Sequence, residues 1–454
     1  MLKVSSSEVR ISLPEDVVNI IKRINTAGYE AYAVGGCVRD SILGRIPGDY
    51  DITTSATPQE IKNIFRRTVD TGIQHGTVTV LIGDTGYEVT TYRIDGKYED
   101  NRHPESVEFT RSLDEDLLRR DFTINAMAYN DDKGLVDLFG GLDDIKSGII
   151  RCVGNPNERL SEDALRILRA LRFASQLGYE IDPDTIEAMK LLAPNLKDIS
   201  MERIESELVK MVTSPHPEIL RTGYEIGVTK VFLPEFDRMM ETGQNHPHHA
   251  YSVGEHTIHA MQNIRADKYL RLAMLFHDMG KPSCKSTDDE GIDHFHGHPE
   301  VSYVMSKDIL RRLKFDNNTI DIVSRLARYH DLKTDGSKRS VRRLVYKVGE
   351  DIFSMLLEVK YADVMAQSTY LRDEKLEEID STGKLYEEIK KNSECLGLKD
   401  LKINGQDLIG IGYPQGTIIG KELKRLLELV LDDPAINDKD VLQKKAAEDL
   451  NEIR

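Results

Sequence analysis

Residues 35–54, GGCVRDSILGRIPGDYDITT, decide the fold of the first part of the chain. They join a Gly-Gly turn to two acids, Asp49 and Asp51, which stand one residue apart where a strand is predicted to begin. Side chains alternate along a strand, so both carboxylates face the same side. Two like charges this close repel unless a divalent cation lies between them, and Mg²⁺ shared with nucleotide phosphates suits such a site.

The sequence around this stretch predicts an α/β domain. Strands are expected at residues 31–34 and 51–54, and residues 77–82 and 87–93 flank the turn GDTG as a hairpin. Glu88, in the second hairpin strand, is the candidate for a third acid at the cation site. Gly35 and Gly36 would let backbone N–H groups approach a triphosphate, and Arg39 would add positive charge.

Residues 35–54 resemble the signature of the nucleotidyltransferase superfamily that includes DNA polymerase β. Within it they resemble the class II tRNA nucleotidyltransferases, the branch of CCA-adding enzymes and bacterial poly(A) polymerases. Residues 119–128, RRDFTINAMA, resemble the ribose-recognition motif of that family, which implies ribose and phosphate contacts for Arg120, Asp121 and Asn125. Residues 137–141, DLFGG, resemble its structural linker motif. The resemblance implies Asp49, Asp51 and Glu88 as catalytic acids with Mg²⁺.

Residues 162–169, EDALRILR, resemble the family's E-D-x-x-R motif. Asp163 and Arg166 are three residues apart on a helix predicted over 161–177, so we expect them on one face. A carboxylate accepts from the amino group of cytosine or adenine, and a guanidinium donates to the adjacent ring nitrogen. Uracil and guanine would lose both bonds. The pair therefore predicts a protein template for C and A, although an isolated pair of this kind would be an ordinary surface ion pair. Arg169 would brace Asp163 or a phosphate.

The polar residues 95–104, DGKYEDNRHP, predict a mobile loop. In the family, a flexible loop at this place helps the enzyme switch from C to A. Its presence favours full CCA addition or A addition.

Histidines gather in the second half of the chain, mostly between residues 246 and 330. Imidazole and carboxylate together bind Zn, Ni, Mn or Fe with positions left open for water and phosphate, and such a metal generates hydroxide. The order of His256, the His277–Asp278 doublet and Asp363 resembles the HD phosphohydrolases. His298, His330 and Asp331 match the extra ligands of binuclear members, and whether a second metal binds is left open.

In bacterial CCA-adding enzymes fused to such a domain, the resemblance implies 2′,3′-cyclic phosphodiesterase or phosphatase action on tRNA ends. A role in repair of the tRNA 3′ end follows as a hypothesis. The metal is not identified by the sequence. The alternative is a degenerate HD fold that serves only as a scaffold.

The resemblance covers nearly the whole chain and implies an α+β multidomain fold, with a polymerase-β-like α/β head followed by helical parts. We expect a nucleotidyltransferase head at 1–150, a helical neck for base recognition at 151–240, an HD domain at 241–372 and a tRNA-binding helical tail at 373–454. The predicted function is template-independent addition of CCA to the 3′ end of tRNA from CTP and ATP. The alternatives are an A-adding enzyme of a split pathway, a poly(A) polymerase, a phosphohydrolase with a non-catalytic RNA-binding head, and a pure tRNA-binding module.

Composition limits the remaining choices. The 454 residues carry a formal net charge of −16, which argues against indiscriminate coating of nucleic acid but allows a local basic groove. Four scattered cysteines predict reduced thiols. Neither a signal peptide nor a membrane span is evident, so we expect a cytoplasmic protein with no membrane partner. The oligomeric state is left open.

Overall fold

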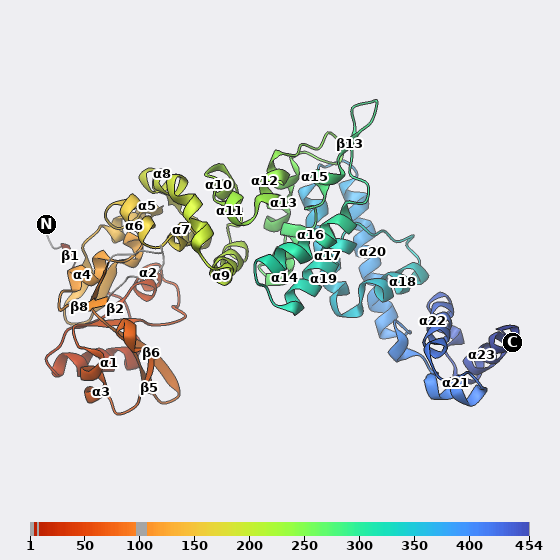
Figure 1. Cartoon of the computed structure of the whole chain (residues 1–454), viewed down its shortest axis with the longest axis horizontal. Coiled ribbons are helices and arrows are strands. Elements are labelled where there is room, and N and C mark those ends of the chain that lie inside the picture. Colours follow the sequence, from red (N-terminus) through yellow and green to blue (C-terminus); the bar gives the residue numbers. More distant parts are fainter. Residues whose placement is uncertain (1–3, 7–8, 97–106, 454) are drawn as a thin grey trace. The chain divides into compact units, whose positions relative to one another are not determined.

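The computed structural model describes residues 4–6, 9–96 and 107–453 (Figure 1). The chain divides into two compact units, Met1–Pro234 and Glu235–Arg454. Residues 97–104 of the loop predicted at 95–104 lie outside the described residues. The division into four domains stays a prediction.

A mixed eight-stranded sheet forms the head of the first unit, in the order β1-β10-β9-β2-β3-β6-β5-β4 (Figure 1). Its strands are β1 (Val4–Ser6), β2 (Ala31–Val34), β3 (Ile52–Thr54), β4 (Thr68–Gly72), β5 (Thr77–Ile82), β6 (Thr85–Thr91), β9 (Met127–Asn130) and β10 (Gly134–Asp137). Only β3 and β6 pair in parallel. A separate pair consists of β7 (Arg93–Asp95) and β8 (Val107–Phe109).

The helices of the head are α1 (Glu15–Thr26), α2 (Gly36–Ile42), α3 (Pro58–Ile64), α4 (Leu113–Leu118) and α5 (Gly141–Ser147), with a 3₁₀ turn, η2, at Thr123–Asn125. Apolar residues recur at helical spacing along α1, and Val17, Ile20, Ile21 and Ile24 are buried. Strands β2 and β9, in the middle of the sheet, are buried at every position. The predicted α/β head is confirmed, and β3 begins one residue later than expected.

The DLFGG stretch joins β10 to α5. The Asp137 carboxylate accepts hydrogen bonds from the backbone N–H groups of Phe139, Gly141 and Leu142, which start the helix. A Cβ at position 141 would overlap the carbonyl oxygen of Thr123. The expected structural role of this stretch therefore has a physical basis, because the helix packs too closely for any side chain at position 141.

Short helices follow the head. They are α6 (Pro156–Glu162), α7 (Leu165–Leu177), α8 (Pro183–Leu192), α9 (Met201–Val212), α10 (Ile219–Glu225), α11 (Thr229–Phe232) and α12 (Pro234–Glu241). A two-residue parallel pair, β11 (Ile149–Ile150) with β12 (Glu180–Ile181), accompanies them. The single helix predicted over 161–177 is wrong. The chain is extended at Asp163, between α6 and α7.

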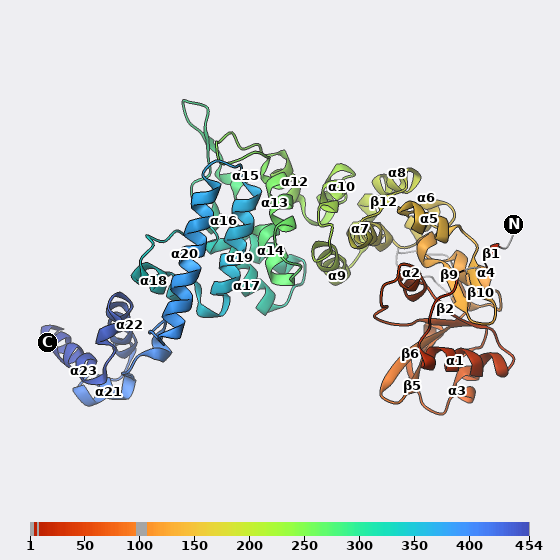
Figure 2. The same ribbon diagram turned by 180° about the vertical axis from the view of Figure 1, so that it is seen from behind.

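The second unit is built almost entirely of helices (Figure 2). Its helices are α13 (Val253–Gln262), α14 (Lys268–Phe276), α15 (Lys281–Cys284), α16 (His298–Arg312), α17 (Asn317–Tyr329), α18 (Lys338–Val348), α19 (Glu350–Ala366), α20 (Arg372–Lys391), α21 (Gly405–Ile411), α22 (Thr417–Asp432) and α23 (Lys439–Ile453). One short hairpin joins β13 (Ser286–Thr287) to β14 (Asp293–His294). The predicted α+β fold class is confirmed.

The helices of the second unit pack against one another in two groups. Helix α17 packs between α14 and α16, and α19 packs against α13 and α20. The last three helices share a core of their own around Leu408, Leu427 and Leu442. Within the described residues, every helix is too short or too polar to cross a membrane.

The packing at position 141 gives a test of the fold. We expect Gly141→Ala to lower the free energy of unfolding by about 1–3 kcal/mol, because the new methyl group must displace backbone. Urea unfolding followed by circular dichroism measures this, since the chain has no tryptophan. Gly420→Ala on α22 meets open space and is the control. Equal midpoints for Gly141→Ala and wild type would contradict the expectation.

Candidate active site and candidate metal centre

The acids of the head gather where β3 meets β6. Asp49 and Asp51 lie in the segment that leads into β3, and the parallel register of Ile52 with Val89 puts Asp51 beside Glu88. All three side chains are exposed. Protein atoms packed around Asp51 raise its pKa, as do the charges of Asp49 and Glu88, while Arg120 lowers it. Like charges are thus concentrated beside the adjacent interior strands β3 and β6, and a divalent cation would relieve their repulsion.

At the Gly-Gly turn, the guanidinium of Arg120 lies close to the backbone of Gly35 and near Asp51. Gly35 has φ +79° at the start of α2, and a Cβ there would lie 3.1 Å from Arg120 Nη1. Arg39, on α2, donates from Nη1 to Asn125 Oδ1 at 2.6 Å and pairs with Asp40. The residues predicted for nucleotide binding therefore lie together. Glycine at position 35 is required both by its dihedral angle and by the nearby guanidinium.

Asp121 links the ribose-recognition stretch to α7. Its Oδ2 accepts from Arg169 Nε at 2.7 Å, and its Oδ1 accepts from the Phe122 N–H at 2.8 Å and from Asn125 Nδ2 at 3.3 Å. Burial alone would raise the pKa of Asp121, but the guanidiniums of Arg169 and Arg166 outweigh it and lower the pKa to about 2. Arg169 therefore pairs with Asp121, whereas the sequence predicted that it would contact Asp163 or a phosphate.

Asp163 and Arg166 do not share a helix face, because α6 ends before Asp163. The Asp163 carboxylate accepts from the Leu165 N–H at 3.0 Å and from Arg203 Nη2 at 2.8 Å. Arg166 donates to the carbonyl oxygens of Arg159 at 2.7 Å and Arg119 at 3.1 Å. The prediction that Asp163 and Arg166 lie on one face of a single helix is therefore wrong. Each side chain is instead held by hydrogen bonds to partners of its own.

In the second unit, four predicted ligands converge. His256 lies on α13, His277 and Asp278 follow α14, and Asp363 lies on α19. His256 Nε2 is 2.8 Å from Asp363 Oδ1 and 3.3 Å from His277 Nε2, which is 3.3 Å from Asp278 Oδ2. Three of these side chains, His256, His277 and Asp278, are grouped closely enough to hold one metal ion.

Asp278 also belongs to a second group. Its Oδ1 lies 3.3 Å from His298 Nε2 and 3.6 Å from His330 Nε2, and these two nitrogens are 3.3 Å apart. Asp278, His298 and His330 are therefore also grouped closely enough for a metal ion, with Asp278 common to both sets. Asp331, by contrast, is an exposed residue of the pocket wall and belongs to neither group.

Hydrogen bonds fix which nitrogen each histidine points inward. Nδ1 of His277, His298 and His330 lies within 3 Å of the carbonyl oxygen three residues earlier. A carbonyl only accepts, so each Nδ1 carries a proton and each Nε2 faces the interior of the site. Burial and the neighbouring His277 and His298 lower the pKa of His330 to about 3, which keeps that ring neutral.

The chemistry of this donor set fits a divalent transition metal. Both carboxylate oxygens of Asp278 are buried, and among the described residues neither is met by a donor in good hydrogen-bond geometry. Their neighbours are histidine nitrogens and the Lys281 ammonium, 2.7 Å from Oδ2. A buried carboxylate faced by several imidazole nitrogens is a donor set that a cation would satisfy.

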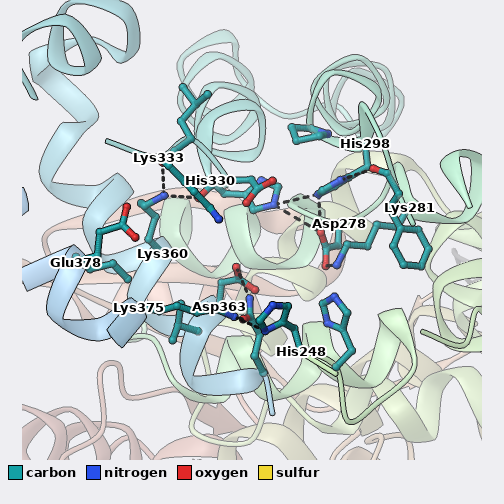
Figure 3. Close-up of a pocket in the computed structure, with 18 of the residues that line it drawn as sticks. His248, Asp278, Lys281, His298, His330, Lys333, Lys360, Asp363, Lys375 and Glu378 are labelled. Carbon is teal, nitrogen blue, oxygen red and sulfur yellow. Dashed lines mark hydrogen bonds and ion pairs between the residues drawn. The ribbon is translucent and has the colours of Figure 1, made fainter. Parts of the chain in front are cut away.

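A cavity of about 400 Å³ opens onto these groups (Figure 3). Four lysines line it, namely Lys281, Lys333, Lys360 and Lys375. Figure 3 shows Lys333 and Lys360 near His330, with Lys375 near Asp363 and His248. Cations around a metal-type donor set suit an anionic ligand such as a phosphate ester.

Comparisons with known proteins agree with this geometry. Three family models match: the "Poly A polymerase head domain" at residues 31–151, the "Probable RNA and SrmB-binding site of polymerase A" at 178–240 and "tRNA nucleotidyltransferase domain 2 putative" at 295–446. The CCA-adding enzyme of Ligilactobacillus salivarius is 37% identical over 439 residues, which are 95% of this chain and 96% of that protein. This chain belongs to the CCA-adding enzyme family.

Solved structures of this family have the same fold. The crystal structure of the Bacillus stearothermophilus CCA-adding enzyme in complex with CTP is 29% identical and matches with a TM-score of 0.70 over 96% of each chain. A second relative, the CCA-adding enzyme of Leuconostoc mesenteroides, is 36% identical over 97% of this chain and 98% of its own. The family predicted from residues 35–54 is confirmed, and with it the class of tRNA nucleotidyltransferase. The family uses a divalent cation, typically Mg²⁺. The HD assignment stays a prediction.

Several residues around the sites were not predicted. Arg203, the partner of Asp163, lies 40 positions along the chain on α9, and the sequence near it gives no signal. Gln367 donates to Asp363 Oδ2 at 3.1 Å, and Lys375 donates to Gln367 and lies 3.0 Å from His248 Nδ1. Lys281 could have been found, because it follows the His277–Asp278 doublet by one helical turn.

The ion pair of Asp121 with Arg169 gives the next prediction. We expect Asp121→Asn to destabilise the protein by about 1–2 kcal/mol at pH 7, because it leaves the half-buried guanidinium of Arg169 without its counter-charge. The folded pKa of Asp121, about 2, is below its unfolded value, so this stabilisation is present above about pH 5 and is lost as pH falls toward 2.

Urea unfolding between pH 7 and pH 3 measures the difference between wild type and Asp121→Asn. The two should converge as pH falls. Asp143→Asn, which changes an exposed carboxylate in the same unit, is the control. A constant difference across this range would contradict the assignment.

Proposed function

We propose that this protein adds CCA to the 3′ end of tRNA without a nucleic-acid template, using CTP and ATP. The observation that carries the proposal is the cluster of Asp49, Asp51 and Glu88 where β3 and β6 pair, in a chain of the CCA-adding family. The CTP named in the B. stearothermophilus complex supports the choice of substrate.

The residues of the chain take separate parts in this reaction. Asp49 and Asp51 would hold Mg²⁺, which would supply neutralisation of phosphate charge when bound. The tRNA 3′-hydroxyl bonds to the α-phosphorus and loses its proton, and pyrophosphate leaves. Gly35 lets the backbone come close to the triphosphate, and Arg120 and Arg39 supply positive charge beside it. Asp163 and Arg166 select the base, the first accepting from an amino group and the second donating to a ring nitrogen.

Single-nucleotide incorporation tests the proposal. The protein is incubated with Mg²⁺, one NTP at a time, and tRNAs that end before CCA, after C and after CC. We expect C, C and A to be added in turn. Addition of A to the CC-ended tRNA alone would favour the A-adding enzyme of a split pathway, and long A tails on any RNA would favour a poly(A) polymerase.

Asp49→Asn should lower the rate of incorporation by on the order of 10³-fold, because it removes a charge that binds the cation. The matched control is Asp84→Asn, which changes an exposed carboxylate at the β5–β6 turn and should leave the rate unchanged. Incorporation by Asp49→Asn at the wild-type rate would overturn the assignment of the catalytic acids.

We also propose that the second unit is a metal-dependent phosphohydrolase of the HD type that acts on tRNA 3′ ends. The buried carboxylate of Asp278, shared by two groups of histidines that could each hold a metal ion, supports this function. A divalent transition metal bound there would supply hydroxide at neutral pH. Lys281 holds Asp278 in place, and the lysines of the cavity would bind the phosphate.

Metal titration tests this second site. We expect Mn²⁺, Ni²⁺ or Zn²⁺ to raise the thermal midpoint, because a ligand at 100 times its Kd stabilises by about 2.7 kcal/mol. In Asp278→Asn the metal should no longer raise the thermal midpoint, and hydrolysis of a 2′,3′-cyclic nucleotide should be lost. CCA addition should be retained.

His330→Gln tests whether the site binds one metal ion or two. If it binds two, this variant should bind only one ion for each chain. His259→Gln, on α13 outside both groups, is the matched control. Wild-type protein that binds no metal and hydrolyses no phosphoester would show that this domain is only a scaffold.

A further inference from the structure

The carboxylate of Asp163 is oriented from a distant part of the chain. Asp163 has extended backbone between α6 and α7, so helix geometry does not set the direction of its side chain. Arg203, on α9, donates from Nη2 to Oδ2 at 2.8 Å, and the Leu165 N–H donates to Oδ1 at 3.0 Å. Each oxygen has one fixed donor and keeps a further lone pair for another.

Arg203 is itself held in place by the packing of α9. One helical turn after Arg203, Glu207 forms a buried ion pair with Arg172 of α7 at 3.1 Å. Helix α9 is therefore joined to α7 by the Glu207–Arg172 pair and to the segment just before α7 by the Arg203–Asp163 pair. Arg203 Nη1 is buried and, within the described part of the chain, has no hydrogen-bond partner, so this guanidinium depends on Asp163 for its pairing.

A carboxylate that selects a base must point its free lone pair in one direction. Cytosine and adenine offer an amino group there, whereas uracil and guanine offer a carbonyl oxygen that repels it. If the carboxylate could turn, it would lose the amino group, and the polar contacts in the pocket would be mismatched. Selectivity therefore requires that something outside the Asp163 side chain fix its orientation.

We propose that Arg203 is a positioning residue for base selection, which acts by holding Asp163 in the orientation that accepts the amino group of C or A. This role rests on the proposed CCA addition and on base reading by Asp163. It adds a specificity-determining residue from α9 to the E-D-x-x-R stretch.

The test measures kcat/KM for CTP and UTP on tRNA that ends before CCA, and for ATP and GTP on tRNA that ends in CC. We expect Arg203→Gln to lower kcat/KM for CTP and ATP by on the order of 10²-fold and to reduce the CTP-to-UTP ratio. Arg203→Lys should recover part of both. Arg151→Gln, which breaks an ion pair to Asp144 and Asp182 elsewhere in the same unit, should leave the ratio unchanged.

A double variant separates positioning from stability. If Arg203 acts through Asp163, Asp163→Ala with Arg203→Gln should discriminate no worse than Asp163→Ala alone. The role of Arg203 would be overturned if the two substitutions reduced selectivity independently, so that their effects multiply in the double variant. A wild-type CTP-to-UTP ratio in Arg203→Gln would also overturn it. Full selectivity in Asp163→Ala would instead overturn base reading by Asp163, and a wild-type protein that incorporates no nucleotide would overturn the proposed function itself.

Discussion

The buried carboxylate of Asp121 is the interaction on which the first unit depends. Three guanidiniums, those of Arg39, Arg169 and Arg172, lie within 5.4 Å of the ring centre of Phe173. Positive charges that close are stable away from water only with acids beside them. Asp121 pairs with Arg169, and Glu207 pairs with Arg172. Because Asp121 also holds Asn125, which accepts from Arg39, one carboxylate connects α2 and the ribose-recognition stretch to α7.

The histidine cluster of the second unit is also held by hydrogen bonds that do two things at once. His277 and His330 each stand one residue after a helix, where the carbonyl groups of the last turn lack partners within the helix. The Nδ1–H group of each ring satisfies the carbonyl three residues earlier. The helix end is capped, and the ring is turned so that Nε2 faces the site. Capping and ligand orientation are therefore achieved by the same hydrogen bond.

The sequence predicted the parts of both sites that depend on local pattern. The D-x-D spacing of Asp49 and Asp51, the hairpin with Glu88 and the His277–Asp278 doublet all follow from short-range periodicity and residue chemistry. Asp163 was misplaced because the E-D-x-x-R spacing fits a helix, and periodicity alone does not reveal that the chain is extended at one residue. Arg203 and Gln367 were missed because their partners are brought to them by tertiary packing.

The two sites differ in how they can hold a cation. Asp49 and Asp51 are exposed in the segment that leads into β3, where few protein ligands are at hand and the remaining positions would be filled by nucleotide phosphates. Asp278 is 1% exposed and stands among four histidines, three of which are oriented by a hydrogen bond at Nδ1. A cation that arrives and leaves with each nucleotide suits the first arrangement. A cation that stays while substrates exchange suits the second, because a buried carboxylate and facing imidazole nitrogens become unfavourable once the cation is removed.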